Sequence, residues 1–85
     1  MEYDNLISYI LNAKNRLIIL RLLKDNGLTA REIAVQTKID YRHVWQKLQE
    51  LKNKQLITHN DVCRNKIYRL TELGEKILSE VEQRG

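Results

Sequence analysis

The chain has 85 residues, no proline, three glycines and a net charge of +4, so it is expected to form one small folded domain and not a disordered linker. Its single cysteine excludes an internal disulfide framework and a multi-cysteine zinc site, which makes the reducing cytoplasm the expected compartment. No apolar run reaches the roughly 18 residues that a membrane span needs, and acidic residues at positions 2 and 4 argue against a signal peptide.

Two helices separated by a break or kink are predicted at the start of the chain, with one continuous helix as the less favoured alternative. Asp4 is expected to cap the first helix, and polar residues within 12–16 interrupt its apolar pattern. The segment 17–23 is apolar nearly all round, which predicts a helix buried on most sides. Gly27 follows this helix and is expected to end it as a left-handed cap.

A helix-turn-helix is predicted over about residues 29–53. In its first helix, Thr29 and Glu32 have the spacing of a capping box. Asp40 is the expected cap of the second helix, over about residues 40–53, which is the expected recognition helix. The apolar side chains of that helix fall on one inward-facing stripe: Val44, Leu48 and Leu51.

A β-hairpin and a last helix are predicted after the helix-turn-helix. Residues 56–59 and 66–70 have the character of strands, and the link 60–65 contains turn-forming residues at both ends. This hairpin would be a wing over about residues 56–70. Thr71 is expected to cap the last helix. The apolar residues of that helix form one stripe: Leu73, Ile77, Leu78 and Val81.

The predicted fold class is therefore mainly α with a small β-hairpin, a winged helix-turn-helix in a single domain that spans residues 1–85. The order of elements is four helices, the hairpin and a C-terminal helix over about residues 71–84. A very short turn between two helices, followed directly by a hairpin, is the feature that distinguishes this class from other small helical folds.

The stretch 28–74 resembles the winged-helix transcription regulators of the MarR and ArsR groups of archaea and bacteria. Residues 15–23 look like the helix that precedes the motif in ArsR-like proteins, and residues 28–34 match the start of the motif. Residues 68–78 look like the Y-x-L-T-x-x-G junction between the wing and the last helix. The resemblance implies a DNA-binding transcription regulator, and no cofactor is expected.

The chain departs from the family pattern at two positions that often hold glycine, which are Lys38 in the turn and Gln55 before the wing. A lysine can adopt the left-handed conformation of the turn at some energetic cost. The paired cysteine or histidine ligands of the ArsR-type metal sensors are also missing from the motif helices. The resemblance therefore does not extend to metal sensing, and no metal ligands are expected.

The candidate base contacts lie on the face of the recognition helix opposite the buried stripe and on the flanks of that face. Arg42 lies in the first turn, which is the end that usually enters the major groove, and arginine can bond guanine bidentately. Glutamine can pair with adenine in the same groove. The expected base contacts are Arg42, His43, Trp45, Gln46 and Gln49.

Tyr41 and Trp45 are neighbours one helical turn apart, at the edge of the buried stripe. They can contact a sugar or a thymine methyl group, or they can pack over Ile39 and the wing. Packing is the favoured interpretation for Tyr41, whereas both interpretations stay open for Trp45.

The distribution of charge predicts contacts with the DNA backbone. Residues 1–70 hold 13 basic and 7 acidic side chains, whereas residues 71–85 hold two basic and four acidic ones. A wing usually contacts phosphates or the neighbouring minor groove, where basic side chains are favoured. The expected backbone contacts are Arg31, Lys47, Arg64, Asn65 and Lys66.

Double-stranded DNA is the expected partner, and no membrane contact is expected. A homodimer through the N- and C-terminal helices is expected because they leave more apolar surface than a thin core needs. The alternatives are an architectural DNA binder without sequence preference and a winged-helix module for protein interactions. An enzyme is not expected, because the chain has no paired carboxylates, nucleophile–base pair, metal cluster or phosphate-binding glycine loop.

Overall fold

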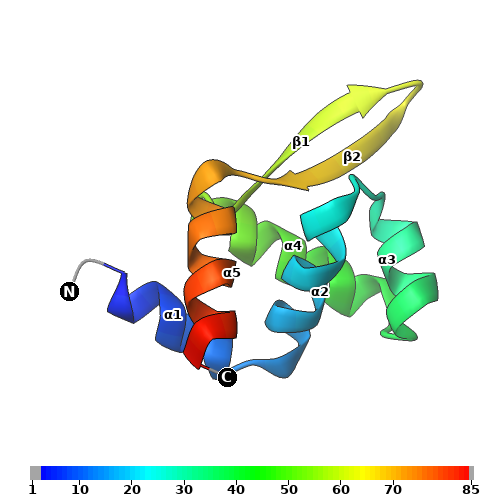
Figure 1. Ribbon diagram of the computed structural model, residues 1–85. Helices are drawn as coiled ribbons and strands as arrows, with labels where there is room; N and C mark the ends of the chain where they lie inside the picture. The colour runs from blue at the N-terminus through cyan, green and yellow to red at the C-terminus, as the bar shows by residue number, and fades with distance from the viewer. Residues whose placement is uncertain (1–2, 85) are drawn as a thin grey trace.

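The computed structural model describes residues 3–84, in which five α-helices pack together and one antiparallel hairpin projects from them (Figure 1). In chain order the elements are α1 (Asp4–Leu11), α2 (Lys14–Asp25), α3 (Ala30–Thr37), α4 (Tyr41–Asn53), β1 (Ile57–Val62), β2 (Asn65–Leu70) and α5 (Glu72–Arg84). This order confirms the predicted class, which is mainly α with a small β-hairpin. The hairpin of β1 and β2 is the wing.

The first two helices are separated by a break where the polar residues predicted one. The C-cap of α1 is Asn12, and Ala13 has an extended backbone with a φ of −135° before α2 begins. Asp4, the expected cap, is instead the first residue of α1, and Tyr3 holds the cap position without a side-chain hydrogen bond. The break lets α1 pack against α5 as well as α2, so the two ends of the described chain lie near each other (Figure 1).

The prediction for Gly27 is wrong, because the C-cap of α2 is Asn26, with an extended φ of −144°, and no described glycine has a positive φ. Glycine fits here for reasons of space: a Cβ atom on Gly27 would lie 2.7 Å from Cγ2 of Ile67 in β2. The next residue, Leu28, exchanges two backbone hydrogen bonds with Tyr68, of 3.1 and 2.8 Å. The link between α2 and α3 therefore ties the wing to the helices.

The helix-turn-helix forms around the predicted capping residues. Oγ1 of Thr29 accepts a hydrogen bond from the Glu32 amide at 3.1 Å, and the Glu32 carboxylate accepts one from the Thr29 amide at 2.9 Å. Lys38 follows α3 in the left-handed conformation, with a φ of 61°. The Asp40 carboxylate then accepts a hydrogen bond from the Arg42 amide at 2.8 Å and caps α4. These local contacts set the short turn between α3 and α4.

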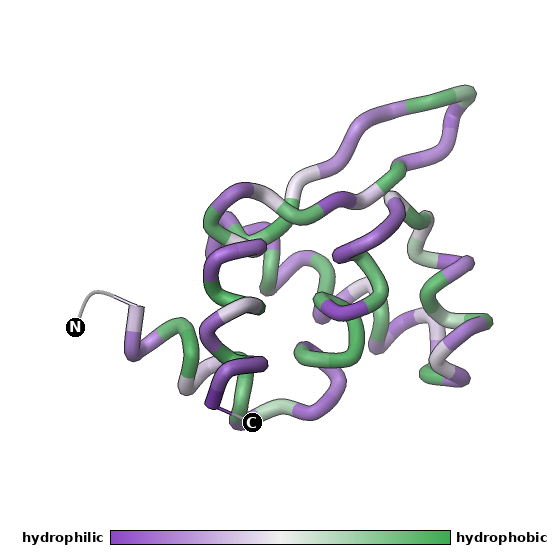
Figure 2. The backbone as a smooth tube through the Cα atoms, in the orientation of Figure 1, coloured by the Kyte–Doolittle hydropathy of each residue, from purple (hydrophilic) through white to green (hydrophobic). Residues whose placement is uncertain are grey.

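The hydrophobic core lies behind α4, where the other helices and the base of the wing converge. The stripe predicted on α4 is confirmed, because Val44, Leu48 and Leu51 are each 0% exposed. Figure 2 shows apolar and polar residues alternating along the helices, as expected for elements that are covered on one side. Other fully buried core residues are Ile10, Ile19, Leu20, Ile33, Leu56 and Ile77.

The wing is longer than predicted and its turn is shorter. β1 and β2 pair along their full lengths, up to Val62 and Asn65, so most of the link predicted over residues 60–65 is strand. Only Cys63 and Arg64 remain in the turn, with φ values of 50° and 69°. Two successive left-handed residues give the two-residue turn whose twist matches that of the flanking strands. The tip of the wing therefore projects well beyond the helices (Figure 1).

The junction between the wing and α5 is held by Thr71, which caps α5 as predicted. Its Oγ1 accepts a hydrogen bond from the Gly74 amide at 3.0 Å and donates one to the Gln55 carbonyl at 2.7 Å. Gln55 has a φ of 64°, in the left-handed region that glycine adopts without strain. Gly74 lies directly against the backbone of Leu56, and a Cβ atom there would clash with the Leu56 carbonyl oxygen.

The apolar stripes of α1 and α5, which suggested extra apolar surface for a dimer, are buried within the chain. Ile7 and Ile10 of α1 are 2% and 0% exposed, and Leu78 and Val81 of α5 are each 1% exposed. Among the described residues of α1 and α5, the exposed large apolar side chain is Leu11, at 48%. The expectation that these helices leave much apolar surface uncovered is therefore wrong, because they cover each other within one chain.

Candidate nucleic-acid interface

The outward face of α4 presents polar side chains opposite the buried stripe. Arg42, His43 and Gln46 are exposed, whereas Val44 and Leu48 on the other side are 0% exposed. At about 100° per residue, Arg42 and Gln46 point almost directly away from the core. A guanidinium, an imidazole and a carboxamide therefore stand together on an exposed helical surface.

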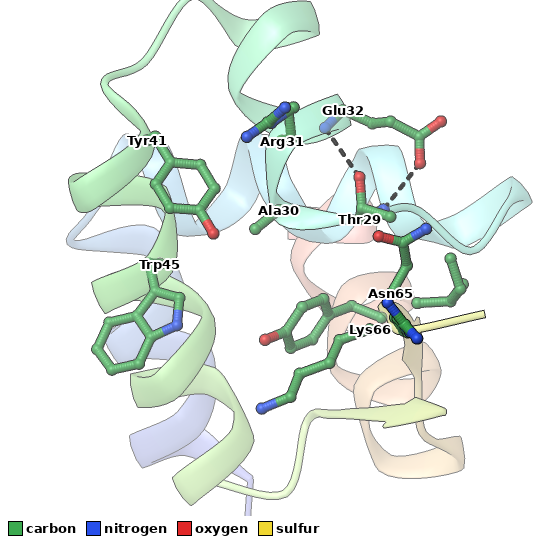
Figure 3. Close-up of a pocket in the computed structure, with 11 residues that line it drawn as sticks. Thr29, Ala30, Arg31, Glu32, Tyr41, Trp45, Asn65 and Lys66 are labelled. Atoms are coloured by element: carbon green, nitrogen blue, oxygen red, sulfur yellow. Dashed lines mark hydrogen bonds between the residues drawn. The ribbon is translucent and has the colours of Figure 1, made fainter. Parts of the chain in front are cut away.

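An open cleft of about 790 Å³ lies between α4, the start of α3 and the wing. Tyr41 and Trp45 line it from α4, as Figure 3 shows. Arg31 lines it from α3, while Arg64 and Lys66 line it from the wing. The cleft therefore combines aromatic surface on one side with three cationic side chains around it.

The two aromatic residues of α4 are only half covered. Tyr41 is 50% exposed and Trp45 is 48% exposed, so each side chain keeps about half of its surface open to solvent. Tyr68, which also lines the cleft, is 2% exposed. Burial raises the pKa of the Tyr68 phenol, and a hydrogen bond with Gln49 partly offsets this rise. Gln49 is half-buried and faces the wing, so less of it is available to a base than of Gln46.

The other edge of α4 is joined to α1 and α2 by a cluster of charged and aromatic groups. Nη2 of Arg16 lies 2.9 Å from Oε1 of Glu50, and Nη1 donates a hydrogen bond of 2.9 Å to the Tyr9 carbonyl. The Tyr9 hydroxyl donates to the same Glu50 oxygen at 3.1 Å. The Arg16 guanidinium also lies 3.7 Å from the centre of the Tyr9 ring. Lys47 lies 3.6 Å from the other Glu50 oxygen.

This cluster neutralises a carboxylate at the edge of the candidate interface. The hydrogen bond from Arg16 is the main cause that lowers the pKa of Glu50, with smaller effects from Tyr9 and Lys47. Burial raises the pKa of Tyr9, and its hydrogen bond to Glu50 raises it further. Sequence reasoning missed Tyr9 and Arg16, because 34 residues separate Arg16 from Glu50 and no local pattern joins them.

The wing carries its polar and charged residues on the outside. Arg64, Asn65 and Lys66 are all exposed, as expected for contacts with a backbone. Further along β2, Arg69 is exposed while Tyr68 is buried, because successive side chains of a strand point to opposite faces. The tip therefore extends a set of hydrogen-bond donors away from the core.

The predicted contact residues fall into three groups. One group lies on the outward face of α4: Arg42, His43 and Gln46. A second group lines the cleft: Arg31, Trp45, Arg64, Asn65 and Lys66. Gln49 lies beside this group through its hydrogen bond with Tyr68. Lys47 lies apart from both, half-buried beside Glu50, so its charge is already partly matched. The structure therefore brings together nine of the ten side chains around the exposed side of α4 and the wing.

Two further observations limit the chemistry of residues 3–84. No group of three histidine, cysteine, aspartate or glutamate side chains in this range could hold a metal ion. None of the helices in the same range is both long and apolar enough to cross a membrane. The single cysteine, Cys63, is exposed in the turn of the wing.

The arrangement of α3, α4 and the hairpin defines the class of the protein. A family model described as "Winged helix-turn-helix" matches residues 16–84, so the chain belongs to the winged helix-turn-helix family. This is a family of DNA-binding transcription regulators and not of enzymes. A search of curated proteins found no match.

Several solved structures are similar to this chain. A variant of ZitR from Lactococcus lactis matches with 26% identity and a TM-score of 0.78, over 84% of this chain and 51% of ZitR. The adhesin competence repressor AdcR from Streptococcus pyogenes matches with 25% identity and a TM-score of 0.78, over 98% of this chain and 69% of AdcR. The chain thus spans about half the length of ZitR.

A smaller protein is similar over nearly its whole length. TubR from Bacillus thuringiensis serovar israelensis, solved bound to 24 bp of tubC, matches with a TM-score of 0.87. The match covers 95% of this chain and 92% of TubR, at 20% identity. At that level of identity the likeness concerns the fold alone.

Proposed function

We propose that this chain is a cytoplasmic, DNA-binding transcription regulator that places α4 in the major groove and the wing on the backbone or in the neighbouring minor groove. The observation that carries the proposal is the division of α4 into a fully buried stripe and an exposed face with Arg42 and Gln46. An α-helix with its side chains is about 10–12 Å wide, which fits a major groove about 12 Å wide.

Base reading is assigned to the exposed face of α4. Within residues 3–84 the Arg42 guanidinium forms no ion pair, so its donors are available to O6 and N7 of guanine. The exposed Gln46 can pair with adenine, and His43 stands beside it on the same surface. One good bidentate contact gives about 1–3 kcal/mol of discrimination between bases.

Phosphate binding is assigned to the cleft and the wing. Arg31, Arg64 and Lys66 are exposed cations around one cleft, and each phosphate that they neutralise releases counterions. Asn65 can add a hydrogen bond to a phosphate oxygen. Lys47 is expected to contribute least of the five backbone candidates, because Glu50 already shares its charge.

A homodimer through α1 and α5 is part of the proposal. Figure 1 places α1 at the opposite end of the molecule from α3, so pairing through the terminal helices would leave both recognition helices exposed. Leu11 offers an exposed apolar contact on α1. Two copies would address half-sites about 34–36 Å apart. Sedimentation at micromolar concentration tests this, and a monomer at every concentration would remove the dimer from the proposal.

The experiment that tests the proposed function is a selection of bound duplexes from a random pool, followed by affinity measurements at stated salt concentrations. A regulator is expected to enrich a defined sequence and to bind it far more tightly than a random duplex. Binding with a specificity ratio near one would indicate an architectural DNA binder. Absence of binding at low salt would contradict the proposal and favour a protein-interaction module.

A further inference from the structure

The proposed base contacts of Arg42 and Gln46 use only the polar side chains of the exposed α4 surface. Its aromatic side chains have no assigned role. Tyr41 and Trp45 lie one turn apart on the wing side of this helix and are 50% and 48% exposed. Each aromatic side chain offers a large apolar contact area, so two half-exposed ones on the same helix form a distinct contact surface. Figure 3 shows both rings along the side of α4 that faces the cleft.

We propose that Trp45, flanked by Tyr41, recognises the C5-methyl group of a thymine next to the base that Arg42 contacts. This inference rests on the proposed function, because it requires α4 to lie in the major groove. Among the base edges exposed in that groove, thymine is the one that presents an apolar group, the methyl at C5. An aromatic ring on the recognition helix is the matching apolar partner.

The position of Trp45 on α4 supports a base contact. Trp45 follows Arg42 by three residues, so at about 100° per residue the two side chains point only about 60° apart around the helix. They can therefore reach neighbouring base pairs from the same turn of α4. Because Trp45 is exposed on a rigid helix and not on a loop, little order has to be gained when the contact forms.

The charges around the cleft support the same contact. Arg31 lies on one wall of the cleft and Lys66 on another, both on the side that Trp45 faces (Figure 3). A DNA strand whose phosphates bind these two cations would pass beside the ring of Trp45. The bases of that strand would then present their major-groove edges to α4, with any thymine methyl toward the aromatic pair.

The test removes the methyl group and nothing else. In the selected duplex, each thymine is replaced in turn by deoxyuridine, which keeps the base pair and lacks only the C5-methyl. At one or two positions in each half-site, the wild-type protein is expected to lose about fourfold in affinity, as for one buried methyl group. Trp45→Ala is expected to bind the thymine and deoxyuridine duplexes equally. Lys66→Ala is the matched control, because it should weaken both duplexes and keep the fourfold ratio.

The same contact has a second readout, because Trp45 is the single tryptophan of the chain. Its emission is expected to shift to shorter wavelengths on binding the selected duplex, and less so on the deoxyuridine duplex. Thermal melting of Trp45→Ala at the wild-type temperature would show that the variant is folded.

The outcomes separate this inference from the proposed function. Absence of binding to any duplex overturns both. Selection of a defined duplex that is insensitive to deoxyuridine at every thymine overturns the methyl contact alone and leaves the regulator. A penalty that persists unchanged in Trp45→Ala also overturns it, because the methyl would then be read by another side chain. Binding that is weakened by Trp45→Ala but not by removal of any thymine methyl would indicate that Trp45 contacts a sugar. That outcome also overturns the methyl contact.

Discussion

Replacing Gly74 by alanine sets two opposing effects against each other at the junction between the wing and α5. Alanine is favoured over glycine inside a helix by about 1 kcal/mol, so helix propensity alone predicts stabilisation. A Cβ atom at position 74, however, would clash with the carbonyl oxygen of Leu56 and lie 3.0 Å from its carbonyl carbon. That carbonyl cannot easily turn away, because it accepts a hydrogen bond of 3.1 Å from the Thr71 amide and belongs to a fully buried residue.

The clash is expected to outweigh the propensity. Overpacking against rigid backbone together with a weakened hydrogen bond opposes folding by about 3–4 kcal/mol, so Gly74→Ala should destabilise the protein by a net of about 2–3 kcal/mol. For a domain of this size that lowers the melting temperature by about 10–20 °C. Thermal unfolding followed by circular dichroism measures this shift. Gly27→Ala is the matched control, with a smaller loss, because its new Cβ meets side-chain atoms of Ile67 and Arg69 and no backbone carbonyl. A Gly74→Ala protein that melts at or above the wild-type temperature would refute the reasoning.

Four further outcomes are expected. Leu48→Ala should lower the unfolding free energy by about 2–5 kcal/mol in chemical denaturation, because Leu48 is 0% exposed. Arg16→Ala should weaken DNA binding in a titration at low salt, because the Glu50 carboxylate loses its partner and repels the phosphates. Adding Glu50→Gln to this variant should restore the affinity. A double variant that binds no better than Arg16→Ala would contradict the repulsion by Glu50. Because the pKa of Glu50 is lowered in the folded state, its stabilising contribution is present above its ordinary pKa of 4.5 and is lost as the pH falls below it. This loss of unfolding free energy should be under about 1 kcal/mol. The Glu50→Gln variant should not show it when stability is measured as a function of pH. Lys66→Ala should reduce the slope of log affinity against log salt by about one unit.

Features set by neighbouring residues could be predicted from the sequence. The capping box of Thr29 and Glu32 and the cap at Asp40 depend on contacts within three residues, so their spacing was sufficient. The stripe of Val44 and Leu48 follows from helical periodicity and the need to bury apolar surface. The exposed position of Arg42, on which the candidate interface depends, then follows from the same periodicity.

Features set by distant parts of the chain could not be predicted in this way. Gly27 lies where β2 approaches, and its place in the fold comes from that contact and not from a left-handed turn. The turn formers near Asn60 and Asp61 lie in paired strand, because the ladder with β2 continues to the tip of the wing. The Arg16–Glu50 ion pair joins elements that only the folded core brings together.

The most direct test of base reading by α4 compares Arg42→Ala with wild type on two duplexes, the selected sequence and a shuffled one, at the same salt concentration. Loss of the Arg42 contact is expected to weaken binding to the selected duplex by roughly five- to 150-fold more than binding to the shuffled one. Arg21→Ala, which removes an exposed arginine paired with Glu82 on α5, is expected to leave this ratio unchanged. An equal loss on both duplexes for Arg42→Ala would contradict the assignment of α4 as the helix that reads DNA.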